Sequence, residues 1–156
     1  MTRTLTIGFA HTAYLLSSMV HATNPQESCA VTSRTDQAPG IPLGDASSWY
    51  GSEFLAALLP PEGKLRLAGP DARIDFKLFL WSPGFEPGME RHLSIVIESV
   101  TDEEAKAIVG KITHAKPIDW DFQAMLAGIE FPGPGCWQIT AKYREKSLAF
   151  VVETFQ

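Results

Sequence analysis

The sequence is short of the features that mark most well-known functional classes. Only two of its 156 residues are cysteines, Cys29 and Cys136, which falls far short of the three or four ligands of a zinc site. Basic residues are outnumbered, with 13 Lys and Arg against 18 Asp and Glu and a net charge of −5. Because nucleic acids and anionic membranes attract basic patches, we expect no nucleic-acid partner.

Long apolar runs and catalytic motifs are also missing. Away from the N-terminus no run of 18 or more apolar residues occurs, so we expect no membrane span in the mature chain. The sequence has no Gly-x-Ser-x-Gly and no Gly-rich phosphate loop ending in Lys-Ser or Lys-Thr. We therefore expect no cofactor and no metal, and the sequence offers no recognisable catalytic constellation.

The first 22 residues have the pattern of a secretory signal peptide. Arg3 provides a basic start, a mostly apolar stretch follows, and Val20 and Ala22 are small residues flanking His21. The alternative is a first core helix or strand, because His11 and several Ser and Thr residues dilute the apolar stretch. We expect an exported protein, located in the periplasm, on the cell surface or outside the cell.

Two further regions follow the predicted signal peptide. Residues 23–48 are rich in Pro, Gly, Ser, Thr and Asp, so they cannot bury enough apolar surface to offset the entropy of ordering. We predict an extended arm there, with Cys29-Ala30-Val31 able to dock locally. Residues 49–156 form the predicted globular domain, and the whole chain of 156 residues has about the length of one domain.

Within this domain, short alternating apolar runs separated by Pro and Gly predict an all-β fold. The two runs flanking Pro60-Pro61-Glu62-Gly63 predict a hairpin. Proline cannot donate to a strand ladder, so the strand before Pro132 should end there. The strands predicted from apolar residues on one face are the following: Phe76, Leu78 and Leu80; Leu93, Ile95 and Ile97; Trp137, Ile139, Ala141 and Tyr143; Leu148, Phe150 and Val152.

The segment at residues 101–112 has two interpretations. Thr101 and Glu104 form a capping-box pattern, and apolar residues then follow at helical spacing, which predicts a short helix over residues 102–109. Gly110 weakens this helix. The alternative is a charged loop that feeds a strand.

Alternation places Cys136 with Gln138 and Lys142 on the polar face of its strand, so it is not predicted to be a core residue. A catalytic cysteine needs a partner histidine. Neither His92 nor His114 has a recognisable spacing to Cys136.

Several stretches together resemble a family of uncharacterised exported bacterial proteins. They are "WYGSEFLAALLPPEG", "KLFLW", "AMLAGIEFPGPGCWQITAKY" and "LAFVV". The resemblance runs from Cys29 to Val152, and Gln138 stands where an acidic residue is more usual. It implies an immunoglobulin-like β-sandwich of about seven strands, behind a signal or lipoprotein leader, and a loop plus strand over residues 100–116. It implies no activity.

Both cysteines occupy positions of this family pattern, which implies a Cys29–Cys136 disulfide. An exported protein meets an oxidising compartment that permits it. Closing a loop of about 107 residues would stabilise the fold by roughly 4–5 kcal/mol in the chain-entropy model. A lipid on Cys29 is the alternative, although Gln26-Glu27-Ser28 lacks the apolar residue that a lipoprotein signal needs.

Aromatic residues beside predicted loops are the candidate binding residues. Trp49 and Tyr50 precede the first strand, Trp81 ends another, and Phe85 lies within "SPGFEPG". Loops at the ends of a sandwich carry binding surfaces, and aromatic side chains anchor contacts. The alternative is that these four residues plug the ends of the core.

Two function classes follow. The first is a non-enzymatic exported module that binds a protein or glycan, or has a structural role in the envelope. The second is a small secreted hydrolase that uses Asp119, Asp121 or a histidine. In a strand, Asp119 and Asp121 would share an exposed face with Trp120 in the core. The missing catalytic constellation favours the first class.

Overall fold

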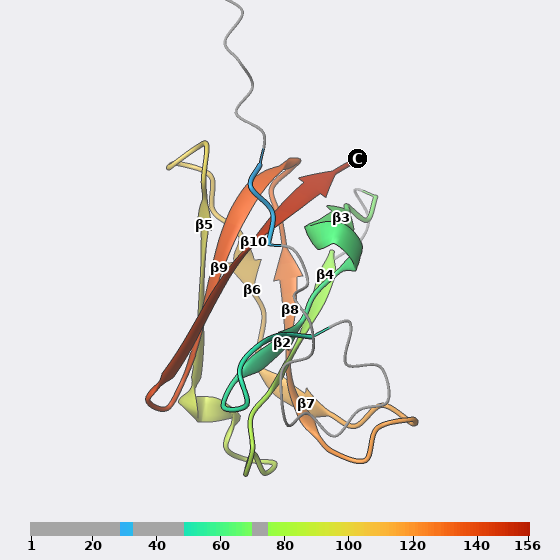
Figure 1. Ribbon diagram of the computed structural model, residues 1–156. Helices are drawn as coiled ribbons and strands as arrows, with labels where there is room; N and C mark the ends of the chain where they lie inside the picture. The colour runs from blue at the N-terminus through green and yellow to red at the C-terminus, as the bar shows by residue number, and fades with distance from the viewer. Residues whose placement is uncertain (1–28, 33–48, 70–74) are drawn as a thin grey trace, which may run out of the picture.

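The computed structural model describes residues 29–32, 49–69 and 75–156. These residues form ten strands and two 3-10 turns of three residues each, which confirms the all-β prediction. Figure 1 shows the strands arranged in two sheets. The predicted signal peptide over residues 1–22 lies outside the described residues, as does the predicted arm over 23–48 except for its residues 29–32.

The larger sheet has the strand order β1-β2-β4-β8-β6, and β7 also pairs with β8. Its strands are β1 (Trp49–Gly51), β2 (Ala56–Leu58), β4 (Phe76–Trp81), β6 (Ile108–Val109), β7 (Thr113–Ala115) and β8 (Ala124–Glu130). All of these pairs are antiparallel. Because β6 and β7 pair with opposite ends of β8, they form one interrupted edge strand.

The smaller sheet has the strand order β3-β10-β9-β5. Its strands are β3 (Lys64–Arg66), β5 (Leu93–Ser99), β9 (Gly135–Tyr143) and β10 (Lys146–Phe155). The β9–β10 hairpin, predicted from its alternation, forms with Tyr143 opposite Lys146. Strand β3 runs parallel to β10, whereas the other pairs are antiparallel.

The main core lies between the two sheets, because its buried side chains come from both. Leu78 and Leu80 of β4 belong to the same cluster as Ile139 of β9 and Phe150 of β10. Each lies on the face that strand alternation assigns to the interior. The two sheets are therefore joined by a common apolar layer.

The predicted hairpin around Pro60-Gly63 is wrong, because β2 and β3 belong to different sheets. Pro61–Gly63 forms a 3-10 turn in which Glu62 has a φ of 55°. This turn carries the chain from the larger sheet to the smaller one. There β3 pairs with β10 instead of folding back on β2.

The helix predicted over residues 102–109 is also wrong. Asp102 holds a turn instead: its carboxylate accepts from the Glu104 N–H at 3.0 Å, and its carbonyl accepts from the Ala105 N–H at 3.1 Å. Ala105, Ala107 and Val109 are partly buried while their neighbours are exposed, a period of two. Pairing of β6 with β8 overrides the local helical spacing, so the loop-plus-strand alternative holds.

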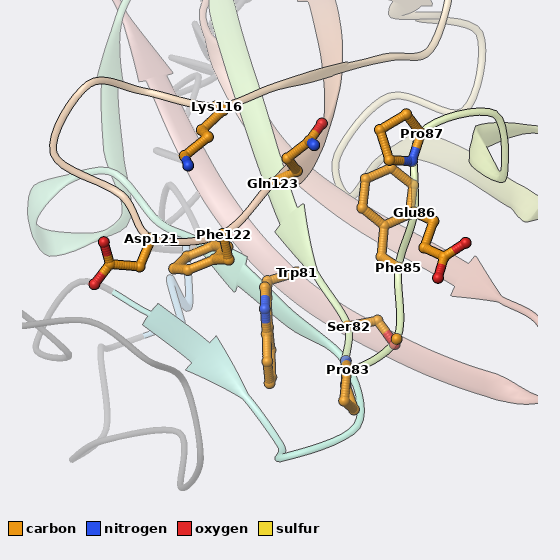
Figure 2. Close-up of a pocket in the computed structure, with 11 residues that line it drawn as sticks. Trp81, Ser82, Pro83, Phe85, Glu86, Pro87, Lys116, Asp121, Phe122 and Gln123 are labelled. Atoms are coloured by element: carbon orange, nitrogen blue, oxygen red, sulfur yellow. The ribbon is translucent and has the colours of Figure 1, made fainter.

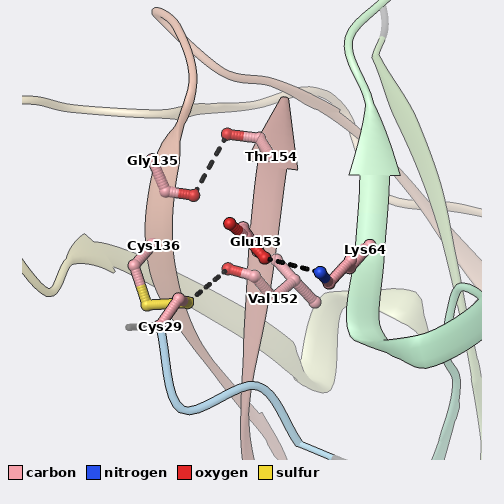
Figure 3. Close-up of polar contacts among 7 residues, drawn as sticks. All are labelled: Cys29, Lys64, Gly135, Cys136, Val152, Glu153 and Thr154. Carbon is pink, nitrogen blue, oxygen red and sulfur yellow. Dashed lines mark hydrogen bonds and ion pairs between the residues drawn. A yellow bond between two sulfur atoms is a disulfide. The ribbon is translucent and has the colours of Figure 1, made fainter. Parts of the chain in front are cut away.

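Residues 29–32 dock on the smaller sheet, as Figure 3 shows for Cys29. Cys29 and Cys136 form a disulfide with Cα atoms 5.5 Å apart. The Thr32 N–H donates to the Val151 carbonyl at 2.9 Å, and the Val151 N–H donates to the Thr32 hydroxyl at 2.8 Å. This short segment is thus fixed to β9 by a covalent bond and to β10 by hydrogen bonds.

The burial of Cys136 corrects one expectation. It does lie on the face of β9 that includes Gln138 and Lys142, both exposed, yet only 5% of Cys136 is exposed. The half-buried Cys29 covers it, and the Cys29 sulphur lies 3.8 Å from the Val152 carbonyl oxygen. Alternation gave the correct face but not the burial, because the cover comes from 107 residues away in the sequence.

Candidate functional site

A second cluster of aromatic side chains lies on the outer face of the larger sheet. Phe79 and Trp81 of β4 point away from the main core, since Leu78 and Leu80 occupy its inner face. Trp49 of β1 joins them and is only 1% exposed. Strand β4 is therefore apolar on both faces, a feature visible in the sequence "FKLFLW".

The loop between β7 and β8 covers part of this cluster. Trp120 and Phe122 stack with ring centroids 5.1 Å apart and an interplanar angle of 25°. Trp120 also meets Phe79 at 5.2 Å and Trp49 at 5.5 Å, and Phe122 meets Trp81 at 6.1 Å. These ring contacts fix the loop on the sheet.

The segment Asp119-Trp120-Asp121 therefore lies in a loop and not in a strand. Both acids are exposed, as predicted. Trp120 is half-buried in the outer aromatic cluster instead of the main core.

A pocket of about 330 Å³ opens between this loop and the loop that follows β4. The two loops meet because β4 and β8 are antiparallel neighbours, with Leu80 opposite Met125, so the end of β4 lies beside the start of β8. Figure 2 shows the side chains that line the opening, with Phe85 and Asp121 on opposite sides. Rings of Trp81, Phe85 and Phe122 form its apolar part.

The loop after β4 is built from two consecutive Pro-Gly turns. The Phe85 N–H donates to the Ser82 carbonyl at 3.2 Å, and the Met89 N–H donates to the Glu86 carbonyl at 3.1 Å. Gly84 and Gly88 have φ values of 69° and 95°. A proline followed by a glycine of positive φ is the signature of a type II turn. Phe85 is thus held between two rigid turns.

The buried Ser82 hydroxyl anchors the same loop by donating to the Phe54 carbonyl at 2.7 Å. The Phe85 ring packs edge-on against Tyr143 of the core, with centroids 6.3 Å apart. The start and the middle of this loop are therefore fixed to the body of the protein.

Four polar side chains surround the aromatic part of the pocket: Glu86, Lys116, Asp121 and Gln123. None of them makes a side-chain hydrogen bond or an ion pair with the residues that the structure describes. The pocket therefore presents two carboxylates, an ammonium group and an amide that are not paired with any described side chain and can bond a ligand.

The four candidate binding aromatics have different environments. Trp49 and Trp81 are 1% and 7% exposed, so they offer little surface for contact, although the edge of Trp81 lines the pocket. Trp49 and Tyr50 also lie within β1 and not before the first strand, and the half-buried Tyr50 packs on Phe150. Phe85 alone combines partial exposure with a position in the pocket.

Sequence reasoning missed most of the pocket. Phe122 follows the Asp119-Trp120-Asp121 stretch and was not singled out, and the polar residues Glu86, Lys116 and Gln123 gave no signal. The apolar outer face of β4 indicates that something covers it. Only the pairing of β4 with β8 shows which loop does so.

The groups considered for catalysis do not converge. His114 Nδ1 lies 2.5 Å from Glu90 Oε1, which links β7 to the 3-10 turn Glu90–His92. Backbone hydrogen bonds from Gly88 and from Glu90 itself, with the contact to His114, hold the pKa of the Glu90 carboxyl below its ordinary value of 4.5. Asp119 is exposed, and Asp121 lines the pocket.

Cysteine chemistry is excluded in this oxidised state, because a disulfide sulphur is neither a nucleophilic thiolate nor a thiolate ligand. Across residues 29–32, 49–69 and 75–156, no three His, Cys, Asp or Glu side chains are grouped so that they could hold a metal ion. The same ranges contain no helix that is long and apolar enough to cross a membrane.

Comparison with protein-family models, with curated proteins and with solved structures gives no match to this chain. What the pocket can do therefore follows from its own side chains.

Proposed function

We propose that this protein is an exported, non-enzymatic binding module with an immunoglobulin-like β-sandwich fold. The pocket at the ends of β4 and β8 carries the proposal, because its unengaged polar groups surround aromatic rings on two fixed loops. Aromatic side chains with a few convergent polar groups in a preformed cavity are typical of small-ligand sites. Binding at loops on a rigid β scaffold is equally common.

The disulfide supports the exported location. Disulfides form and persist in the periplasm, on cell surfaces and outside cells, and are rare in the cytosol of mesophiles. The Cys29–Cys136 bond is well buried on its β9 side, where Cys136 is 5% exposed. A signal peptide over residues 1–22 would deliver the chain to such a compartment.

The immunoglobulin-like assignment is supported by two mostly antiparallel sheets that share a common core, and by Trp137 in that core. One feature departs from antibody-type domains, in which a disulfide joins the two sheets. Here the disulfide joins β9 to the preceding arm on the outer face.

Nothing in the described residues favours the hydrolase alternative over binding. Asp121 is the only one of its proposed catalytic groups that lines the pocket. A hydrolase also needs a nucleophile or an activated water, and the one hydroxyl that lines the pocket, that of Ser82, is engaged with the Phe54 carbonyl.

Location and binding are tested separately. The full chain with its own N-terminus, expressed in a bacterial host, should appear outside the cytoplasm with no thiol open to alkylation. Purified oxidised protein should then sediment with isolated bacterial envelopes in a saturable way, and an Asp121→Ala/Gln123→Ala variant should sediment less. Cytoplasmic retention with two free thiols would contradict the proposed location, and equal sedimentation of wild type and variant would contradict the proposed site.

A further inference from the structure

The chemistry of the pocket lining restricts the class of ligand. The partly exposed rings of Phe85 and Phe122 offer apolar surface, while Glu86, Asp121, Gln123 and Lys116 offer both acceptors and donors. A ligand that fits must therefore present an apolar face and several groups that both donate and accept hydrogen bonds. Pyranose sugars have this combination, since their C–H faces pack on aromatic rings and their hydroxyls bond carboxylates, amides and ammonium groups.

The charge of the lining disfavours anionic ligands. Glu86 and Asp121 carry two negative charges against the single positive charge of Lys116. An anionic ligand such as phosphate would be repelled by the two carboxylates, whereas a basic ligand would be attracted by them more than it is repelled by Lys116, because the lining has a net charge of −1. A neutral polyhydroxylated ligand avoids the repulsion that an anion meets, and its hydroxyls can donate to the carboxylates and accept from the ammonium group as well.

The size and rigidity of the pocket fit the same class. Its volume of about 330 Å³ lies at the lower end of small-molecule pockets, about 300–1,000 Å³. The Pro-Gly turns at Gly84 and Gly88 and the Trp120–Phe122 stack fix both loops before any ligand arrives. Preorganisation of this kind lowers the entropic cost of binding.

We propose that this pocket binds a neutral saccharide, as a monosaccharide, a disaccharide or the end of a glycan chain. The inference rests on the proposed binding function and specifies its ligand. Phe122 and Phe85 supply the apolar contact, Asp121 and Glu86 accept from sugar hydroxyls, and Lys116 donates to sugar oxygens. Gln123 does both through its amide.

A titration followed by two-dimensional amide NMR tests the inference on the full oxidised chain. The probes are N-acetylglucosamine, maltose and cellobiose, with glycylglycine and inorganic phosphate as zwitterionic and anionic comparators. At least one sugar should shift the amides of Phe85, Asp121 and Gln123 and the Trp81 indole in a saturable way. We expect a Kd on the order of 1 mM, because a small open pocket makes few contacts.

Variants of exposed or unengaged side chains locate the binding without disturbing the fold. Asp121→Asn and Gln123→Ala should each weaken sugar binding about three- to tenfold, the equivalent of one hydrogen bond. Ile118→Ala is the matched control, because Ile118 belongs to the same loop, is fully exposed and does not line the pocket. It should leave the affinity unchanged, and the spectra report whether each variant is folded.

Any of three results would overturn the inference. In the first, no sugar gives saturable amide shifts up to its solubility limit. In the second, glycylglycine or phosphate binds more tightly than every sugar, and in the third neither pocket variant changes the sugar affinity. Envelope binding that depends on the pocket but is not competed by sugars would leave the proposed function intact and remove only the saccharide. Loss of both would remove the function and the ligand together.

Discussion

At the scale of single residues, glycines with positive φ fix the places where the chain turns sharply. Gly51 ends β1 with a φ of 135°, and Gly63 ends the 3-10 turn with a φ of 67°. A Cβ at Gly63 would lie 2.9 Å from the Val31 Cβ, so this position also gives room to the docked segment. Residues other than glycine rarely adopt such backbone conformations, and at these two positions an added Cβ would also collide with neighbouring atoms.

Gly51→Ala should be among the most destabilising single methyl additions in the protein. The added Cβ would lie 2.4 Å from the Leu55 carbonyl oxygen and 2.9 Å from the Ala56 Cα. Backbone strain and this collision together should lower the free energy of unfolding by about 3 kcal/mol or more. Chemical denaturation of the oxidised protein measures the loss.

Gly133→Ala is the matched control for this change. An added Cβ there meets nothing within 4 Å, and its φ lies outside the positive range. It should change the free energy of unfolding by less than about 1 kcal/mol and can even raise it. Similar losses at Gly51 and Gly133 would contradict the account of Gly51.

At the scale of elements, the connection between β4 and β5 is tied to its surroundings at several points. Ser82 bonds the Phe54 carbonyl, Phe85 packs on Tyr143, and Glu90 contacts His114 of β7. The last contact joins the 3-10 turn to the interrupted edge strand of the larger sheet. Because it involves a carboxylate with a lowered pKa, its contribution depends on pH.

Removing the Glu90 charge should destabilise the protein at neutral pH but not in acid. The folded-state pKa of Glu90 is below its ordinary value of 4.5, so its stabilisation is fully present above that value. The contribution is lost as the pH falls through the lowered folded-state pKa. Glu90→Gln should therefore unfold at lower denaturant than wild type at pH 7, and the difference should shrink in acid.

Urea midpoints measured at neutral and acidic pH check this prediction. Glu103→Gln, on the exposed turn after β5, serves as the control, because its carboxylate makes no hydrogen bond or ion pair with the residues that the structure describes. If the urea midpoints of wild type and Glu90→Gln differ by the same amount at both pH values, the Glu90 side chain acts through packing and not through its charge.

At the scale of the whole molecule, the disulfide connects the arm to the C-terminal hairpin across 107 residues. The surrounding contacts are modest: the paired hydrogen bonds of Thr32 with Val151 and an ion pair of Lys64 with Glu153 at 3.4 Å between largely exposed side chains. An exposed ion pair of this kind contributes only about 0–1 kcal/mol. The covalent link is therefore the main restraint on residues 29–32.

Removing the disulfide should lower the free energy of unfolding far more than removing the Lys64–Glu153 ion pair. In the chain-entropy model a loop of this length is worth roughly 4–5 kcal/mol. A Cys29→Ala/Cys136→Ala variant should lose an amount of that order in the free energy of unfolding, and Lys64→Met should lose less than about 1 kcal/mol. Chemical denaturation of wild type and both variants, under oxidising and under reducing conditions, measures these differences in the free energy of unfolding.

Reduction should bring wild type down to the stability of the double variant. If the double variant and the oxidised wild type unfold at the same denaturant concentration, the disulfide does not stabilise the fold. The bond would then serve only to hold the arm in place.

The sequence predicted the elements whose pattern is local. Alternation over nine residues assigned the inner face of β9 correctly, and Pro and Gly marked the loop that follows β4. Phe85 was chosen from its Pro-Gly surroundings, and it does line the pocket. Trp81 and Asp121, which also line it, were singled out as a candidate binding aromatic and a candidate catalytic acid. Glu86, Lys116, Phe122 and Gln123 were missed because no local pattern marks a side chain whose neighbours come from another loop.

What the sequence by itself determined is the all-β class, the faces of the long strands and the positions of the turns, because each depends on neighbours a few residues apart. Only the tertiary structure decided that β3 joins β10, that residues 108–115 follow the edge of β8, and that Cys136 is covered. It alone also assembled the pocket from residues 81–87 and 116–123. These features depend on contacts between distant segments, whose free energies outweigh local preferences such as the helical spacing after Asp102.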